Sequence, residues 1–293
     1  MTQSEGGTVT EQWQSLAPGL YIVATPLGNL GDMTTRARDV LAAVDRVLCE
    51  DSRVTGRLLH HLGISARLAP YHDHNAASMR PTILGWLADG ARLALVSDAG
   101  TPLISDPGYK LVAEARAAGH AVVAVPGPSA LTAALSIAGL PTDRVLFLGF
   151  PPSKSGARRA LLDRYRDVDA TLVLYESPKR LAAALADLAD RLGPREAAIC
   201  REMTKRFEEV RRGRLDDLAA DIAGTDVKGE IVLVIAPPAP AEAVDSTDID
   251  AALTDALTRM SLREAADAVA GATGAPRRRV YQRALALKPA ADR

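Results

Sequence analysis

The chain of 293 residues has little cysteine and no long hydrophobic run. Its two cysteines, Cys49 and Cys200, lack the spacing of a metal site and are too few for a disulfide framework. The longest apolar runs, such as Val122–Val125 and 231–236, fall far short of the roughly 20 residues that a membrane-spanning helix needs. The N-terminus has neither the basic nor the apolar segment of a secretory signal peptide. These absences favour a reduced, cytoplasmic protein without membrane spans.

Two common nucleotide-binding motifs are also absent. The chain contains neither the G-x-G-x-x-G fingerprint of dinucleotide-binding proteins nor the glycine-rich lysine pattern of P-loop proteins. No set of His, Cys, Asp and Glu residues has metal-ligand spacing, so we expect no metal site. A nucleotide-like ligand would therefore need a different kind of binding loop.

Charge is distributed unevenly along the chain. The formal net charge is −1, but the segment from residue 259 to the end holds eight basic residues and three acidic ones. The remainder is therefore acidic by a similar amount. A basic C-terminal segment indicates a polyanionic partner, although a basic helix face in solvent would give the same pattern.

The apolar pattern predicts two α/β domains and a small helical module. Residues 19–142 alternate short buried strands with amphipathic helices, which is typical of a largely parallel sheet. Strands lie closer together over residues 143–237, and a mixed sheet is expected there. A Pro/Ala-rich linker follows at 238–248, and a basic helical module is predicted at 249–293. Residues 1–18 are predicted to be a flexible tail.

Four loops that follow predicted strands are rich in Gly, Pro and hydroxyl or acidic residues. They cover residues 25–32, 97–108, 126–130 and 176–180. In open α/β sheets, ligands bind where such loops converge at the carboxyl ends of the strands. Glycine lets backbone approach a ligand closely, and proline fixes the loop before binding. The alternative is four independent surface turns.

A series of motifs gives this pattern a family resemblance. In chain order they read "LYIVATPLGNLGDMTTRA", "CEDSRVTGRLL", "YHDHN", "LVSDAGTPLISDPG", "VPGPSALTAALSIAGLP", "FLGFPP", "YESPKR", "CREMTKRFEE" and "GEIVLVI". Together they resemble the tetrapyrrole (corrin/porphyrin) methylase superfamily. Within it they are similar to the ribosomal RNA small subunit methyltransferase I branch, which methylates the ribose 2′-oxygen of a decoding-centre cytidine in 16S rRNA.

The resemblance implies a two-domain tetrapyrrole-methylase-like α/β fold that binds S-adenosylmethionine in the interdomain cleft. It also implies a homodimer that acts on 16S rRNA or the small ribosomal subunit. The implied cofactor-binding residues lie in the loops and near the last strand: Pro26, Gly100, Thr101, Pro102, Ile104, Ser129, Ala130, Tyr175, Met203, Gly229 and Glu230.

One position departs from the wider superfamily. Its small-molecule methylases usually have Gly-Asp-Pro where this chain has Gly100, Thr101 and Pro102. The threonine form is similar to the rRNA branch and argues against a corrin or porphyrin substrate.

Methyl transfer to a ribose hydroxyl benefits from a general base, and several acidic and histidine residues are candidates. Each has a structural alternative: helix capping for two of them, and an ion pair for the two carboxylates of "CEDSR". The histidines of "YHDHN" favour RNA contact or acid–base work over a core position. The catalytic candidates are Asp32, Glu50, Asp51, His72 and Glu176.

Basic and polar residues near these motifs are candidates for phosphate contact. A charged run of this kind is usually a solvated face, and the family resemblance favours RNA binding instead. The candidates are Arg53, Asn75, Lys154, Lys205, Arg206, Arg211, Arg277, Arg278 and Arg279.

The C-terminal pattern predicts a helix, a Gly-containing turn and a second helix. Ser261 and Glu264 have the spacing of a capping box. Apolar residues 265, 266 and 269 should pack against Val280 and Leu285. Three arginines, 277–279, would then lie exposed at the start of the second helix, where they oppose the helix dipole and suit a phosphate partner.

Three functions are compatible with these features. The first is an S-adenosylmethionine-dependent rRNA 2′-O-methyltransferase. The second is a methylase of a tetrapyrrole or corrin intermediate, and the third is a non-catalytic RNA-binding or ribosome-assembly factor with a degenerate cofactor cleft. The basic C-terminus and Thr101 favour the first.

Overall fold

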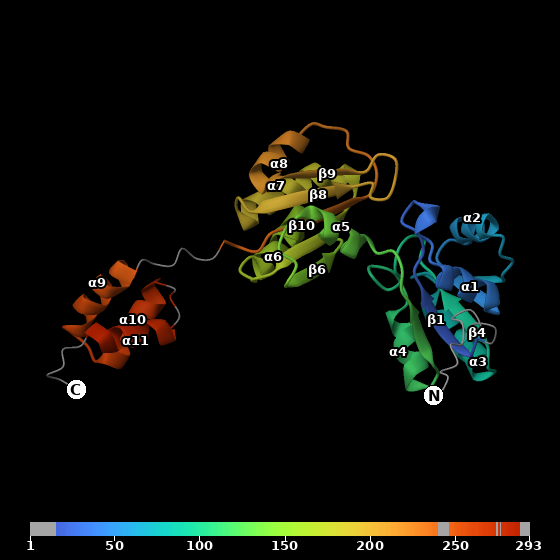
Figure 1. Cartoon of the computed structure of the whole chain (residues 1–293), viewed down its shortest axis with the longest axis horizontal. Helices are drawn as coiled ribbons and strands as arrows, with labels where there is room; N and C mark the ends of the chain where they lie inside the picture. The colour runs from blue at the N-terminus through green and yellow to red at the C-terminus, as the bar shows by residue number, and fades with distance from the viewer. Residues whose placement is uncertain (1–15, 240–245, 274, 276, 288–293) are drawn as a thin grey trace, which may run out of the picture. The chain divides into compact units, whose positions relative to one another are not determined.

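The computed structural model describes residues 16–239, 246–273, 275 and 277–287. This part of the chain divides into a two-sheet unit that ends at Ala236 and a C-terminal helical unit. Among the described residues, no helix has both the length and the apolar character that crossing a membrane requires. Figure 1 labels the elements of both units.

The first sheet has five parallel strands in the order β3-β2-β4-β1-β5, as the alternating pattern predicted. Strand β1 pairs Leu20 with Leu93 of β4 on one side and with Val122 of β5 on the other. The strands are β1 (Gly19–Val23), β2 (Arg46–Cys49), β3 (Leu68–Pro70), β4 (Arg92–Leu95) and β5 (Val122–Val125). Because all strands are parallel, the loops that follow them gather at one edge of the sheet.

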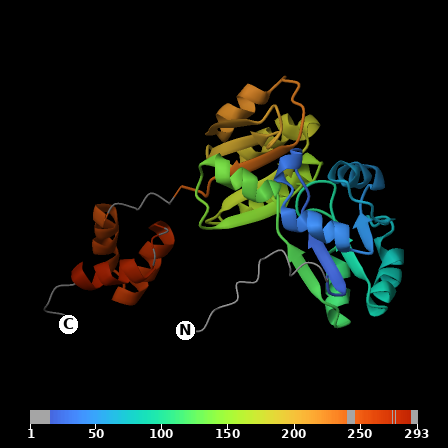
Figure 2. The ribbon, with the colours of Figure 1, turned by 45° about the vertical axis from the view of Figure 1, so that its right-hand side comes forward.

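Helices cover both faces of this sheet (Figure 2). One face packs against α1 (Thr35–Ala43) and α2 (Ser52–Leu62), and the other against α3 (Ala76–Ala88) and α4 (Tyr109–Ala117). Local sequence sets the start of α1, because the Thr34 hydroxyl accepts a hydrogen bond of 3.1 Å from the Ala37 amide.

The second sheet is mixed, as predicted, with the order β6-β7-β10-β8-β9. Only β6 and β7 run parallel to each other, and the other neighbours are antiparallel. Its strands are β6 (Val145–Gly149), β7 (Thr171–Glu176), β8 (Glu196–Arg201), β9 (Glu209–Arg214) and β10 (Ile231–Ile235). All five residues of β10 are buried, since a strand lies on each side of it and helices cover the sheet.

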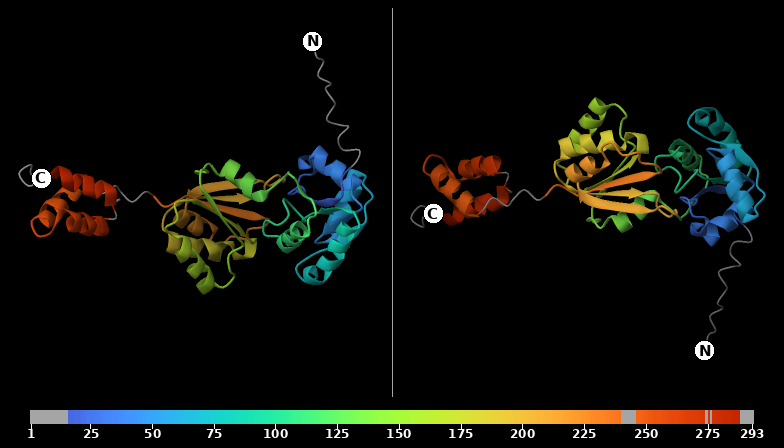
Figure 3. Two further views of the ribbon diagram at one scale, coloured as in Figure 1. Left: turned by 90° about the horizontal axis from the view of Figure 1, so that it is seen from below. Right: turned by 90° about the horizontal axis from the view of Figure 1, so that it is seen from above.

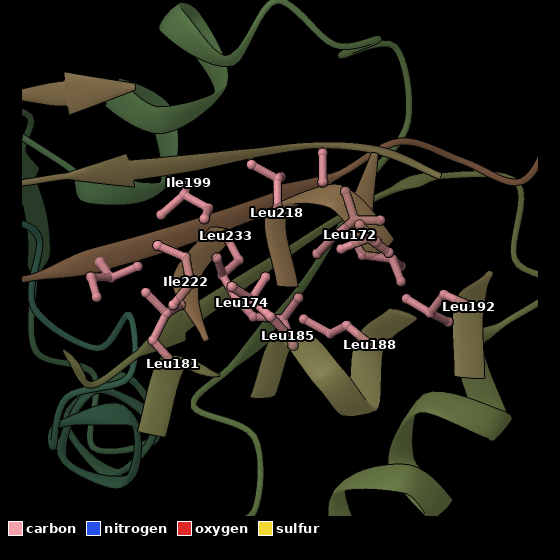
Figure 4. Close-up of a cluster of buried hydrophobic side chains, with 14 of the residues drawn as sticks. Leu172, Leu174, Leu181, Leu185, Leu188, Leu192, Ile199, Leu218, Ile222 and Leu233 are labelled. Carbon is pink, nitrogen blue, oxygen red and sulfur yellow. The ribbon is translucent and has the colours of Figure 1, made fainter. Parts of the chain in front are cut away.

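Two different groups of helices cover the second sheet (Figure 3). One face packs against α6 (Ser155–Tyr165), α7 (Leu181–Leu192) and α8 (Leu215–Ile222), which form the leucine-rich core of Figure 4. The other face packs against α5 (Ala130–Ala138). The proposed boundary at residue 142 places α5 with the first sheet in sequence, although its side chains pack on the second.

Strands β3 and β9 were not predicted from the sequence. Strand β9, with the sequence EVRRGR, is too charged to give an apolar strand pattern. It lies at the edge of the sheet and pairs only with β8, so its arginines extend into solvent. Charged residues on an edge strand also oppose pairing with other chains.

The C-terminal unit is a three-helix cluster with its own core. It consists of α9 (Ser246–Leu257), α10 (Leu262–Thr273) and α11 (Arg277–Leu287), so its first helix begins within the proposed linker. The predicted capping box is confirmed: the Ser261 amide donates to Glu264 Oε2 at 3.0 Å, and the Glu264 amide donates to the Ser261 hydroxyl at 3.4 Å.

One packing prediction for this unit is wrong. Ala265, Ala266, Val269 and Val280 are buried together as expected, but Leu285 is 45% exposed. Ala284 takes its place in the core, because it lies one helical turn after Val280 and therefore on the same face of α11.

Candidate functional site

A cleft of about 400 Å³ lies where the strand-end loops meet. Its walls come from the loops after β1, β4 and β5, and from the second sheet near the end of β7 and the start of β10. Nine of the residues predicted to bind cofactor line it: Gly100, Thr101, Ile104, Ser129, Ala130, Tyr175, Met203, Gly229 and Glu230. Pro26 and Pro102 are buried beside Leu27 and Thr101 but are not among the lining residues.

Hydrogen bonds tie the 97–108 loop to the neighbouring loops. Thr25 and Gly100 exchange backbone hydrogen bonds of 2.9 and 3.0 Å, and the Ser97 hydroxyl donates to the Gly100 carbonyl at 3.1 Å. The Thr101 hydroxyl donates to the Pro128 carbonyl at 2.9 Å. The loop is therefore fixed in shape, which lowers the entropy cost of binding a ligand there.

Two apolar residues of the cleft lie between strained neighbours. Ile104 is flanked by Leu103 and Ser105 with φ of 73° and 67°, and Met203 is flanked by Glu202 and Thr204 with φ of 51° and 66°. The left-handed region costs a non-glycine residue on the order of 1 kcal/mol or more, and such strain concentrates at functional sites.

The strained 202–204 turn is held by polar contacts around one carboxylate. Glu202 Oε1 accepts a hydrogen bond of 2.9 Å from the Glu230 amide and another of 2.9 Å from Lys205 Nζ. Gly229, with φ of 96°, has no room for a side chain because a Cβ there would collide with Glu202. Glycine at 229 therefore lets the start of β10 approach the turn that carries Met203.

Two carboxylates that were not predicted from the sequence line the cleft. They belong to Asp98 and Asp106. Burial, followed by the charge of Glu50, raises the pKa of Asp106 from 3.8 to about 6, despite a hydrogen bond with Ser97. Aspartates in a Gly/Pro-rich loop normally indicate turns, so only the folded structure distinguishes this one. A carboxylate with a pKa of about 6 is a suitable general base at neutral pH.

Two of the predicted catalytic residues, Glu50 and Asp51, lie close to this carboxylate pair, and His72 lies close to Glu50. Asp98 Oδ1 accepts a hydrogen bond of 3.2 Å from the Asp51 amide. Partial desolvation and the charges of Asp98 and Asp73 raise the pKa of Glu50, while His72 lowers it. None of these three residues, Glu50, Asp51 and His72, lines the cleft. Any effect that they have on the reaction would therefore act through the local electrostatic field.

Asp51 has the geometry of a helix cap. Its Oδ1 accepts a hydrogen bond of 2.8 Å from the Arg53 amide at the start of α2, and its Oδ2 pairs with the Arg53 guanidinium at 2.7 Å. These bonds to Arg53 lower the pKa of Asp51 to about 2, which makes it a weak base.

Asp32 lies in the short 3₁₀ helix Leu30–Asp32, outside the cleft lining. Its Oδ2 is buried without a hydrogen-bond partner among the described residues, as is Nδ1 of His72. Asp32 and His72 remain catalytic candidates, although neither lines the cleft.

Comparison with known proteins agrees with this geometry. Residues 19–219 match the tetrapyrrole (corrin/porphyrin) methylases, and residues 243–288 match the RsmI C-terminal HTH domain. A relative from Mesorhizobium japonicum named ribosomal RNA small subunit methyltransferase I is 49% identical over 275 residues, which cover 93% of each chain. One of the same name from Erythrobacter litoralis is 50% identical and covers 94% of this chain and 97% of its own.

The chain belongs to the ribosomal RNA small subunit methyltransferase I family, within the tetrapyrrole methylases. Solved structures share the fold at low identity. Uroporphyrin-III-C-methyltransferase from Thermus thermophilus is 22% identical, covers 75% of this chain and 92% of its own, and has a TM-score of 0.51. A diphthine synthase is 16% identical, covers 74% and 89%, and has a TM-score of 0.57.

This family uses S-adenosylmethionine as methyl donor, and the cleft fits such a molecule. Its volume of about 400 Å³ is within the usual range for small-molecule sites. Ile104, Met203 and Tyr175 offer apolar contacts, and the backbone beside Gly100 and Gly229 is accessible for polar ones. When bound, the cofactor supplies an activated methyl group on a sulfonium.

Glu176 lines the cleft, but its oxygens are already engaged. Its side chain has no exposed surface; Oε1 accepts a hydrogen bond of 2.7 Å from the Ser177 amide, and Oε2 accepts one of 3.0 Å from Arg180. This geometry favours a structural role.

Replacing Glu176 with glutamine tests the two roles. We expect Glu176→Gln to lower the free energy of unfolding by about 2–3 kcal/mol, below the value for a fully buried pair because Arg180 is 31% exposed. Methyl transfer per folded molecule should remain near the native rate. Denaturant titration and turnover assays measure both quantities. A normally stable variant that has lost turnover would restore Glu176 as a catalytic residue.

Four of the eight predicted RNA-binding arginines and lysines already have acidic partners. Arg53 pairs with Asp51, Lys205 with Glu202 and Glu230, Arg211 with Glu209, and Arg277 with Asp267. The side chain of Asn75 closes its own loop through the His72 amide and the Pro70 carbonyl, and Arg206 lies over the Phe207 ring.

Three predicted cations have neither an acidic partner nor a ring contact among the described residues. Lys154, Arg278 and Arg279 are exposed, and none has an ion-pair partner within the described ranges. Their charges are therefore the most available of the set for phosphate groups.

Proposed function

We propose that this protein transfers a methyl group from S-adenosylmethionine to the ribose 2′-oxygen of a decoding-centre cytidine in 16S rRNA. The observation that carries the proposal is the similarity to relatives named ribosomal RNA small subunit methyltransferase I over more than nine-tenths of both chains. We further propose that it acts as a homodimer, in the cytoplasm, on the small ribosomal subunit. These finer points rest on the resemblance of its motifs.

We infer that Asp106 removes the proton of the ribose hydroxyl. It lines the cleft, and its pKa of about 6 leaves it ionised and still basic at neutral pH. Ile104, Met203 and the fixed 97–108 loop would position the cofactor for an in-line displacement, in which alignment supplies much of the rate. Glu50 and His72 would tune the charge of Asp106.

A direct assay separates this function from the alternatives. Purified protein is incubated with tritiated S-adenosylmethionine and either unmodified small ribosomal subunits or a corrin precursor. Label in the RNA supports the proposal, and primer extension at low nucleotide concentration then locates a 2′-O-methyl group. Label in the macrocycle would support a tetrapyrrole methylase, and label in neither would support a non-catalytic factor.

The C-terminal unit is the proposed second RNA-binding element. Deleting residues from 246 onward should leave S-adenosylmethionine affinity unchanged, because the two-sheet unit keeps its own cores. RNA affinity should fall on the order of tenfold. The slope of log K against log salt should become shallower by about 0.7–0.9 for each phosphate group that the shortened protein no longer neutralises.

Charge variants of the full-length chain refine this test. The double variant Arg278→Gln and Arg279→Gln should reproduce most of the loss of affinity. Arg259→Gln is the matched control, because Arg259 is already paired with Asp255. Unchanged affinity and salt slope in the truncated protein would exclude this unit from RNA binding.

A further inference from the structure

Phe150 is a large apolar side chain that the structure leaves open at the cleft. It lines the cleft wall and is 58% exposed. Its ring packs edge-on against Tyr175 with centroids 5.5 Å apart, and Tyr175 packs in the same way against Phe147 at 4.9 Å. One part of the Phe150 ring is thus supported by aromatic neighbours while most of its surface faces solvent.

The loop that carries Phe150 is clamped from inside by two arginines. Arg180 donates a hydrogen bond of 2.6 Å to the Pro151 carbonyl. Arg158 donates to the next two carbonyls, those of Pro152 at 3.3 Å and Ser153 at 3.2 Å. Three consecutive carbonyls after Phe150 are therefore fixed by guanidinium groups.

Each clamping arginine is held in turn by a buried carboxylate. Arg180 pairs with Glu176, whose side chain is fully buried, and Arg158 pairs with Asp187 at 2.5 Å, where the two side chains are 3% and 5% exposed. Buried ion pairs add little net stability compared with apolar packing, whereas they fix one geometry. The arrangement holds the exposed Phe150 ring in one position. A residue that only faces solvent does not need to be held in this way.

The charge around this loop suits a polyanion. Lys154 and Lys179 are exposed on the two segments that the clamp joins, and neither has an ion-pair partner in the described part of the chain. Lys179 directly follows Pro178, which lines the cleft. An exposed aromatic ring with lysines nearby is the combination that binds single-stranded nucleic acid, where bases stack on rings and cations contact phosphates.

We propose that Phe150 is a stacking platform for the base of the nucleotide whose ribose is methylated. This inference rests on the proposed RNA methyltransferase function and names the residue that holds the substrate base at the cleft. A stacked base fixes the attached ribose, so that its hydroxyl can be oriented toward the cleft.

The test compares substitutions at position 150 in the full-length protein. Phe150→Ala should raise KM for unmodified small ribosomal subunits on the order of 10- to 100-fold. Phe150→Leu, which keeps apolar bulk without a ring, should behave like Phe150→Ala, and Phe150→Trp should retain near-native KM. Calorimetric titration should show S-adenosylmethionine affinity within about twofold of native in all three. Tyr109→Ala is the control, since Tyr109 is a 69% exposed aromatic outside the cleft lining.

Native KM for subunits in Phe150→Ala would overturn the inference while the proposed function stands. If that variant also bound S-adenosylmethionine more weakly, the ring would lie against the cofactor instead of the substrate base. Failure of the native protein to label RNA would instead remove the proposed function and this inference together.

Discussion

Asp106→Asn is expected to slow methyl transfer on the order of 10²- to 10⁴-fold, the usual contribution of a positioned base. Because the reacting form is the carboxylate, native turnover should rise with pH and level off above about pH 6, where Asp106 is ionised. The asparagine variant should lack this acidic limb. Turnover measured from about pH 5 to about pH 9 under saturating substrates gives both quantities.

The same variant should be more stable than the native protein at high pH. The folded-state pKa of Asp106 is raised from 3.8 to about 6, so folding favours its protonated form. The stability that this form contributes is present below about pH 4 and is lost as pH rises through about 6. At about pH 8 Asp106→Asn should gain about 1–2 kcal/mol, a value reduced for partial exposure, and the difference should vanish near pH 4.

Asp89→Asn provides the matched control for both measurements. Asp89 is exposed, lies outside the cleft lining and is not among the charges that shift the pKa of Asp106, so its removal should leave turnover within a few fold of native. Native turnover and an unchanged pH profile in Asp106→Asn would show that another group accepts the proton.

The fold follows from the sequence where local signals are strong. Alternation of apolar runs predicted the parallel first sheet, and the Ser261–Glu264 pair predicted a helix start that the structure confirms. Strand β9 was missed because an edge strand with one solvated side needs no apolar run. The packing of α5 on the second sheet depends on tertiary contacts that periodicity does not encode.

The loops of the candidate site were predictable, but the state of individual side chains was not. Gly/Pro composition identified the loops that meet at the cleft, including the one that carries Gly100, whereas Gly229 was implied by the family resemblance alone. Asp106 acquires its raised pKa from burial and from Glu50, which is distant in sequence. Arg211 and Lys205 were expected to be available for phosphate, yet folding places carboxylates beside both. Burial and partner choice are properties of the folded chain.

Thr101→Arg is expected to weaken S-adenosylmethionine binding roughly 100-fold or more, equivalent to about 2.7 kcal/mol. Thr101 lines the cleft and is only partly buried, so a longer side chain has space to enter the ligand volume without disturbing the core. Position 101 is a better place than position 100 to test cofactor binding in the cleft. A valine at Gly100, where φ is 84°, would strain the backbone and bring its Cβ within 3.1 Å of Leu27, which mixes folding effects with binding effects.

Thr101→Val separates the effect of blocking the cleft on affinity from the effect of losing the Thr101 hydrogen bond. It removes only the donor to the Pro128 carbonyl, which is worth about 1 kcal/mol, and should leave affinity within roughly tenfold of native. Calorimetric titration measures cofactor binding, and thermal melts of the same samples should show both variants folded. A folded Thr101→Arg protein with near-native affinity would mean that the cofactor does not occupy the space beside Thr101, and the cleft would then need a different ligand.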